Sequence, residues 1–105
     1  MATGNFRHSV YFWLNEESLE EGARKTIEAC RANLTDIPGI VKMTLGVPAS
    51  TSGGPVDTSY GVALIIEFED KAAHDVYDIH PGHQRMISEC SHLWSRVQVY
   101  DSVPV

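Results

Sequence analysis

The sequence predicts an α+β fold in which a four-stranded antiparallel sheet carries helices on one face. Four segments are typical of strands and three repeat apolar residues at helical spacing, in the order β-α-β-β-α-α-β. The chain has 105 residues, which is enough for one domain over residues 1–105 and too few for two separate cores.

Residues 6–14 form the first predicted strand, and both of its faces carry aromatic side chains. One face holds Phe6, His8, Val10, Phe12 and Leu14, and the other holds Arg7, Ser9, Tyr11 and Trp13. A helix over about 16–34 follows, with Asn15 as its expected N-cap and acidic residues in its first turns. Its apolar stripe consists of Leu19, Ala23, Ile27, Cys30 and Leu34.

The sequence in the middle of the chain predicts two strands joined by a long loop. Pro38 and Gly39 end the helix and lead into a β-branched segment over 40–47. Segment 49–58 has no apolar periodicity and is expected to be a mobile loop. Residues 59–68 give the strongest strand prediction. Its inner face is expected to hold Tyr60, Val62, Leu64, Ile66 and Phe68.

The last third of the chain predicts two helices and a final strand. Asp70 is expected to cap a short helix, and His80 must leave the α-helical region because the ring of Pro81 crowds it. Pro81 suits the first position of a third helix, and residues 96–100 return as a strand. Two α-β units around a central hairpin give the ferredoxin-like arrangement.

Composition and charge narrow the classes of partner. The chain is 43% hydrophobic and 21% charged, as soluble globular proteins are. Its 8 Lys and Arg stand against 14 Asp and Glu, so a nucleic-acid or anionic-membrane partner is not expected. Without a leader-like or membrane-spanning apolar run, a cytoplasmic location is expected. Cys30 and Cys90 form no C-x-x-C pair and are expected to be reduced core thiols.

The sheet face away from the helices is expected to bind a second copy of the chain. It would carry Tyr11, Trp13, Ile65 and Tyr100, an apolar patch larger than a monomer usually exposes. A chain of this length buries only roughly 60–70% of its unfolded surface, so self-association would hide further apolar area. The sequence therefore predicts a homodimer through this face. The alternative, that these aromatic residues are half-exposed surface, stays open.

Several motifs along the chain recur together in one known family. They are His8 in the first strand, Ile37-Pro38-Gly39, a strand from Tyr60 that ends Phe68-Glu69-Asp70, the run Tyr77-Asp78-Ile79-His80-Pro81-Gly82-His83, and Val97-Gln98-Val99-Tyr100-Asp101. Together they resemble the stress-responsive dimeric α/β-barrel (Dabb) domain family over nearly the whole chain. The resemblance implies a homodimer whose two sheets form a barrel. It implies no single activity, because relatives include stress-induced proteins and plant polyketide (olivetolic acid) cyclases.

The cyclases of that family close a linear polyketide by aldol condensation without a cofactor. Their catalytic tyrosine and histidine correspond to Tyr77 and His83 here, and a first-strand histidine of their pocket corresponds to His8. Val62 occupies the position of a further pocket histidine. Because of this departure, the resemblance does not imply the same substrate.

The residues themselves predict that His8, Tyr77 and His83 face one apolar space between the sheet and the helices. Its expected walls are Phe6, Val62, Met86 and Trp94. The first hypothesis is a binding protein for an apolar or aromatic small molecule. In the alternative, a cofactor-free enzyme, His83 removes a proton next to a carbonyl while Tyr77 donates to the developing oxyanion. A monooxygenase ranks behind both, because no oxygen-activating group is identifiable.

Each of these side chains also has a purely structural interpretation. His8 would be a hydrogen-bonded core residue, His83 would contact backbone at a helix start, and the Tyr77 hydroxyl would be satisfied locally. His80 would close the second helix. The two remaining histidines, His74 and His92, are expected to be solvated. No carboxylate or thiolate set accompanies the histidines in sequence, so neither a metal site nor a cofactor is expected.

Overall fold

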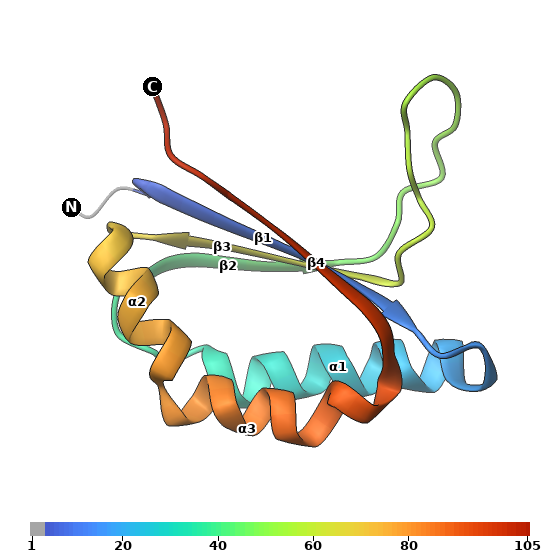
Figure 1. Cartoon of the computed structure of the whole chain (residues 1–105), viewed down its shortest axis with the longest axis horizontal. Coiled ribbons are helices and arrows are strands. Elements are labelled where there is room, and N and C mark those ends of the chain that lie inside the picture. The colour runs from blue at the N-terminus through green and yellow to red at the C-terminus, as the bar shows by residue number, and fades with distance from the viewer. Residues whose placement is uncertain (1–3) are drawn as a thin grey trace.

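The fold is a four-stranded antiparallel sheet with all its helices on one face (Figure 1). The computed structural model describes residues 4–105, so residues 1–3 of the predicted domain lie outside the described range. The elements are β1 (Phe6–Leu14), α1 (Leu19–Leu34), β2 (Ile40–Gly46), β3 (Val62–Phe68), α2 (Lys71–Ile79), α3 (Pro81–Cys90) and β4 (Trp94–Ser102), with 3₁₀ turns at Glu16–Ser18 and Ser91–Leu93. The strand order is β2-β3-β1-β4, which confirms the predicted ferredoxin-like α+β fold.

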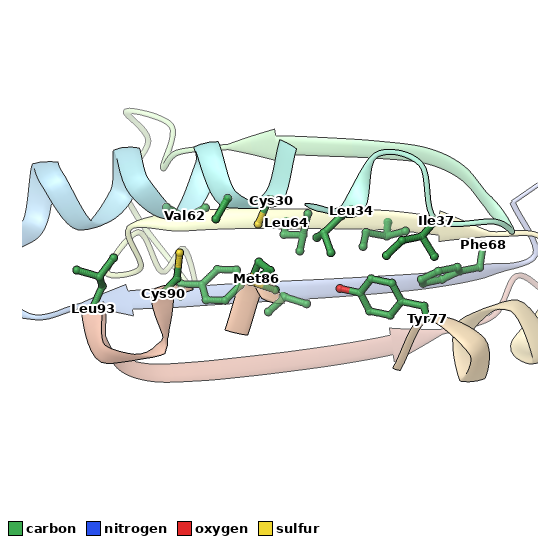
Figure 2. Packing of buried hydrophobic residues seen from close by; sticks show 14 of the residues in the cluster. Cys30, Leu34, Ile37, Val62, Leu64, Phe68, Tyr77, Met86, Cys90 and Leu93 are labelled. Carbon is green, nitrogen blue, oxygen red and sulfur yellow. The ribbon is translucent and has the colours of Figure 1, made fainter. Parts of the chain in front are cut away.

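The hydrophobic core lies between the sheet and the helices (Figure 2). The inner face of β3 is wholly buried, as its alternation predicts, and consists of Val62, Leu64, Ile66 and Phe68. Cys30 of α1 and Cys90 of α3 enter this core as free, buried thiols. Burial raises the pKa of Cys30 to about 12, so its thiol stays protonated. The prediction of core thiols is confirmed.

The start of α1 differs from the sequence prediction. A 3₁₀ turn over Glu16–Ser18 precedes the α-helix, and Leu19 is exposed rather than part of the buried stripe. The face that α1 buries consists of Gly22, Thr26, Ala29, Cys30 and Leu34. Thr26 belongs to it because its hydroxyl accepts a hydrogen bond of 3.0 Å from the Trp94 indole. Asn15 stands at the predicted position, but its side chain donates to the carbonyl of His92 instead of capping the turn.

The expectation that Tyr60 shares the inner face of β3 is wrong. The strand begins at Val62, and a Cβ added to Gly61 would lie 2.1 Å from Leu14 Cδ2 on the inner side. The alternation therefore breaks at Gly61, and Tyr60 contacts Tyr11 on the outer face, with ring centroids 4.9 Å apart.

One residue separates the last two helices. His80 has extended backbone, with ψ 139°, and stands at both the C-cap of α2 and the N-cap of α3. Its Nδ1 accepts a 2.9 Å hydrogen bond from the backbone N–H of Gly82, and Pro81 follows as the first residue of α3. The structure confirms the prediction that His80 closes α2. At the start of α2, Asp70 accepts a 2.8 Å bond from the N–H of Ala73, as predicted.

Gly82 is the point where α3 meets the backbone of α1. A Cβ at this position would lie 2.2 Å from the carbonyl oxygen of Asn33. We expect Gly82→Ala to lower the free energy of unfolding by about 2–3 kcal/mol, because backbone on both sides must move. Thermal denaturation would show this as a fall in Tm of about 10 °C.

Gly46→Ala in β2 is the matched control for this substitution, since a Cβ there would meet nothing within 4 Å. We expect it to change the stability by no more than about 0.5 kcal/mol. Equal shifts in Tm for the two variants would show that α1 and α3 are not in close contact at Gly82.

Across residues 4–105, no helix combines the length and the apolar character needed to cross a bilayer.

Candidate functional site

A pocket of about 240 Å³ lies between α3 and the inner faces of β1 and β4. It forms because α3 packs against α1 rather than against β4. Its apolar walls are Val10, Phe12, Leu64, Met86, Ile87, Trp94, Val97 and Val99, and its polar lining consists of His8, Tyr77, Asp78 and His83. Val97 and Val99 of β4 are 41% and 40% exposed, so this side of the pocket is open.

The structure brings five of the predicted site residues to this pocket and leaves two elsewhere. The five are His8, Tyr77, His83, Met86 and Trp94. Phe6 and Val62 are buried in the core and do not line it. Val62 pairs with Phe12 across the sheet, and Phe6 stacks on His74 with ring centroids 4.7 Å apart.

Sequence reasoning missed several lining residues on the same strand faces. Val10 and Phe12 alternate with His8 on β1, and Val97 and Val99 lie opposite them on β4. The period of two could have identified all four once the pairing of β1 with β4 was assumed. No comparable sequence pattern indicated that Asp78 lines the pocket.

Tyr77 and His83 lie side by side although they come from different helices. Their ring centroids are 4.5 Å apart. His83 Nδ1 lies 3.1 Å from the backbone carbonyl of Asp78, and because a carbonyl only accepts, Nδ1 carries the proton. The Nε2 of neutral His83 therefore keeps a free lone pair. Burial lowers the pKa of His83 and so favours this neutral form.

The Tyr77 side chain supplies a hydrogen-bond donor next to this acceptor. The residue is only 1% exposed, and burial raises the pKa of its hydroxyl well above its ordinary value. The hydroxyl therefore stays protonated. Figure 2 shows the oxygen of Tyr77 pointing along the core towards Met86.

His8 is held by a residue of the neighbouring strand. His8 and Asp101 are register partners of β1 and β4, and His8 Nδ1 lies 2.6 Å from Asp101 Oδ1. The imidazole also makes an edge contact with Tyr77, with centroids 5.6 Å apart. His8 is thus a hydrogen-bonded core residue and a pocket residue at once.

The expectation that His74 is solvated is wrong. Its side chain is only 12% exposed, because its position on α2 stacks the ring on Phe6. Its ring centroid is 5.1 Å from that of His8. His74 and Tyr77 stand three positions apart and therefore share the inward face of α2. His92 is exposed, as predicted.

The sequence also matches a described protein family. Residues 6–104 fit the family model of the Stress responsive A/B Barrel Domain, called Dabb. The chain belongs to the Dabb family. This match covers almost the entire chain and agrees with the motifs that surround Tyr77 and His83.

Several solved structures are similar to this Dabb domain in fold. A Dabb family protein with a ferredoxin-like fold from Mesorhizobium loti is 23% identical, with a TM-score of 0.77 over 98% of this chain and 99% of that one. A dimeric protein of unknown function from Bacteroides fragilis is 22% identical, with a TM-score of 0.75 over 99% and 100% of the chains. A dimeric ferredoxin-like protein of unknown function from Thermobifida fusca is 16% identical, with a TM-score of 0.80 over 99% and 95%. No functionally curated protein of similar sequence is found.

The outer sheet face of this Dabb domain is rich in aromatic residues. A hollow of about 300 Å³ on it is lined by Tyr11, Trp13, Asp57, Tyr60 and Tyr100. The Arg96 guanidinium lies 4.4 Å from the centroid of the Trp13 ring, and the Trp13 indole donates to the hydroxyl of Ser59 at 2.9 Å. The helices cover the opposite face (Figure 1).

Proposed function

We propose that this Dabb domain binds a small apolar or aromatic molecule that carries a hydroxyl or carbonyl oxygen. The observation that carries the proposal is the pocket of about 240 Å³, whose walls are apolar and whose polar groups gather around Tyr77 and His83. Ligand sites in proteins commonly combine apolar walls with a few placed polar groups.

The polar groups of the pocket favour a ligand with one oxygen at its end. A ligand hydroxyl can donate to Nε2 of His83, whose Nδ1 proton is directed to the Asp78 carbonyl. A ligand carbonyl can accept from the Tyr77 hydroxyl. The remaining ligand surface would contact Met86 and the valines of β4, where burial of apolar area supplies the affinity.

Binding of 1-naphthol, compared with naphthalene, tests this proposal. Both are aromatic, and only 1-naphthol carries a hydroxyl for His83. We expect His83→Ala to weaken the binding of 1-naphthol about tenfold more than it weakens the binding of naphthalene, because one hydrogen bond contributes about 0.5–1.5 kcal/mol. Fluorescence titration would measure both affinities.

The control for this titration is His92→Ala, which changes an exposed histidine outside the pocket. We expect it to leave both affinities unchanged. If wild-type protein binds neither compound, or if His83→Ala weakens both equally, His83 does not recognise a ligand oxygen.

Acid/base catalysis is the second candidate, and the facing Tyr77 and His83 rings favour it. His83 Nε2 would take a proton from the carbon next to a ketone, and the C–H electron pair would move into the enolate. Tyr77 would donate to the enolate oxygen. The enolate carbon could then attack a second carbonyl of the same molecule and close a ring by aldol-type chemistry, and the alkoxide formed from that carbonyl would take the proton back from His83 Nε2. This step needs no oxidant and no cofactor, and the resemblance to plant polyketide cyclases points to the same class of reaction.

We also propose that the domain is a homodimer that pairs through its outer sheet face, including Tyr11, Trp13, Ile65 and Tyr100. The apolar character of that face supports the proposal, and so do the dimeric structures from Bacteroides fragilis and Thermobifida fusca. Two sheets packed in this way would form the α/β barrel. The cytoplasmic location stays a prediction of the sequence.

A further inference from the structure

We propose that His8, His74 and Asp101 form a binding site for a divalent transition-metal ion such as Zn²⁺. One ligand atom from each residue lies within 4.8 Å of the other two. The three residues come from β1, α2 and β4, so only the folded chain brings them together. The site shares His8 with the pocket, but it does not depend on the proposed function.

The ligand types suit zinc and related ions. Two imidazole nitrogens and one carboxylate oxygen are common zinc ligands, and three protein ligands leave one coordination position open for water or a bound molecule. Bonds of about 2.0–2.2 Å to a tetrahedral ion place ligand atoms roughly 3.4 Å apart. The contact of 2.6 Å between His8 Nδ1 and Asp101 Oδ1 would therefore lengthen when an ion binds.

A second carboxylate already orients one of the ligands. His74 Nδ1 lies 3.1 Å from Asp75 Oδ1, and Asp75 is itself held by Lys71 at 2.8 Å. This contact leaves Nε2 of His74 as the nitrogen for a metal ion. Metal-binding histidines commonly donate their other nitrogen to a carboxylate in this way. Asp78 Oδ1, at 3.7 Å from His74 Nε2, adds a further oxygen close to the site.

Packing fixes both imidazoles before an ion arrives. The side chains of His8 and His74 are only 9% and 12% exposed, and His74 stacks on Phe6. Asp101 is 40% exposed, so an ion can enter from its side and this side chain can adjust. Rigid imidazoles with one adjustable carboxylate need little reorganisation to bind an ion.

Zinc titration of the untagged, chelator-treated full chain tests the proposal. We expect calorimetry to show one Zn²⁺ per chain. We expect Co²⁺ to give visible d–d bands without the near-ultraviolet band of a thiolate ligand. His74→Phe keeps an aromatic ring on Phe6 and removes a ligand, and Asp101→Asn keeps the side-chain shape and removes the charge. Each should weaken Zn²⁺ binding at least about tenfold.

The matched control is His92→Ala, which removes an exposed histidine outside the cluster and should leave zinc affinity unchanged. Zn²⁺ should also raise the Tm of the wild type, and should not raise that of His74→Phe. Should His74→Phe fail to fold, the exposed Asp101→Asn variant still decides the outcome. The proposal is overturned if the wild type binds no Zn²⁺, if both variants bind it as tightly as the wild type, or if Co²⁺ shows a thiolate band from Cys30 or Cys90. Binding of 1-naphthol is measured separately, so failure of one proposal leaves the other standing.

Discussion

Tyr77→Phe and His83→Ala are each expected to slow α-proton exchange of a bound ketone by about 10²–10⁴-fold. The suitable probe is 2-tetralone, an aromatic ketone with acidic protons next to its carbonyl, followed by NMR in D₂O. Wild-type protein should accelerate the exchange of these protons with solvent. His83→Ala removes the Nε2 lone pair that accepts the proton, and Tyr77→Phe removes the donor to the enolate oxygen.

The effects of the two substitutions on the exchange rate should not be additive. Because the Tyr77 and His83 rings are 4.5 Å apart, both groups would act on the same ketone at the same moment. The double variant should therefore be little slower than the more damaged single variant. His92→Ala should exchange at the wild-type rate. If wild-type protein exchanges 2-tetralone no faster than buffer containing free imidazole, the acid/base proposal fails and only binding is left.

Ile65→Glu is expected to convert a dimer into a monomer. Ile65 lies on the outer face of β3, paired with Ser9 of β1 and Thr44 of β2, at the middle of the sheet. In a two-fold dimer the substitution places two carboxylates in the interface, where each loses its water shell without gaining a partner. The dissociation constant should rise at least about 10³-fold, because each buried unpaired charge costs several kcal/mol.

Sedimentation analysis would measure this change as a fall from about twice the chain mass to the chain mass. The control is Val76→Glu, which adds the same charge at an exposed position of α2. That variant should sediment as the wild type does. A wild-type protein that already sediments as a monomer would contradict the proposed pairing, as would an Ile65→Glu variant that remains a dimer.

Strong, regular patterns allowed much of the fold to be predicted from the sequence. The unbroken alternation from Val62 to Phe68 predicts a strand that is buried on its inner face, and the structure buries that face completely. The steric demand of Pro81 likewise predicts the break between two helices at His80. In both cases the local preference and the tertiary packing agree.

The errors occur where a local irregularity or a tertiary contact overrides the sequence pattern. Leu19 fits the helical stripe by spacing, but the preceding 3₁₀ turn leaves it exposed. Tyr60 follows the strand alternation until Gly61 breaks it. His74 was expected to be solvated, yet its ring stacks on that of Phe6. The first two departures occur at a local irregularity, a 3₁₀ turn and a glycine, and the third depends on packing between α2 and β1.

Site residues were predictable where they lie in one motif or on the expected inward face of one element, as His8, Met86 and Trp94 do. Tyr77 and His83 belong to a short run that resembles a known family, and they do meet in the pocket. The cluster of His8, His74 and Asp101 has no such run, because His8 and Asp101 are 93 positions apart and meet only through the pairing of β1 with β4. Spacing along the chain cannot indicate a set of ligands that strand register assembles.

The extended backbone at His80 determines how the two key rings meet. In an uninterrupted α-helix, residues six positions apart point roughly 120° away from each other, since each step turns the chain by about 100°. Because His80, between Tyr77 and His83, is not helical, α3 runs in a different direction from α2 and the two rings come together. The relative orientation of the Tyr77 and His83 rings therefore depends on the backbone conformation of His80. Because Gly82 lies directly against the backbone of α1, any change of that turn would also disturb the packing of α3 on α1, so the ring geometry and the helix packing are linked.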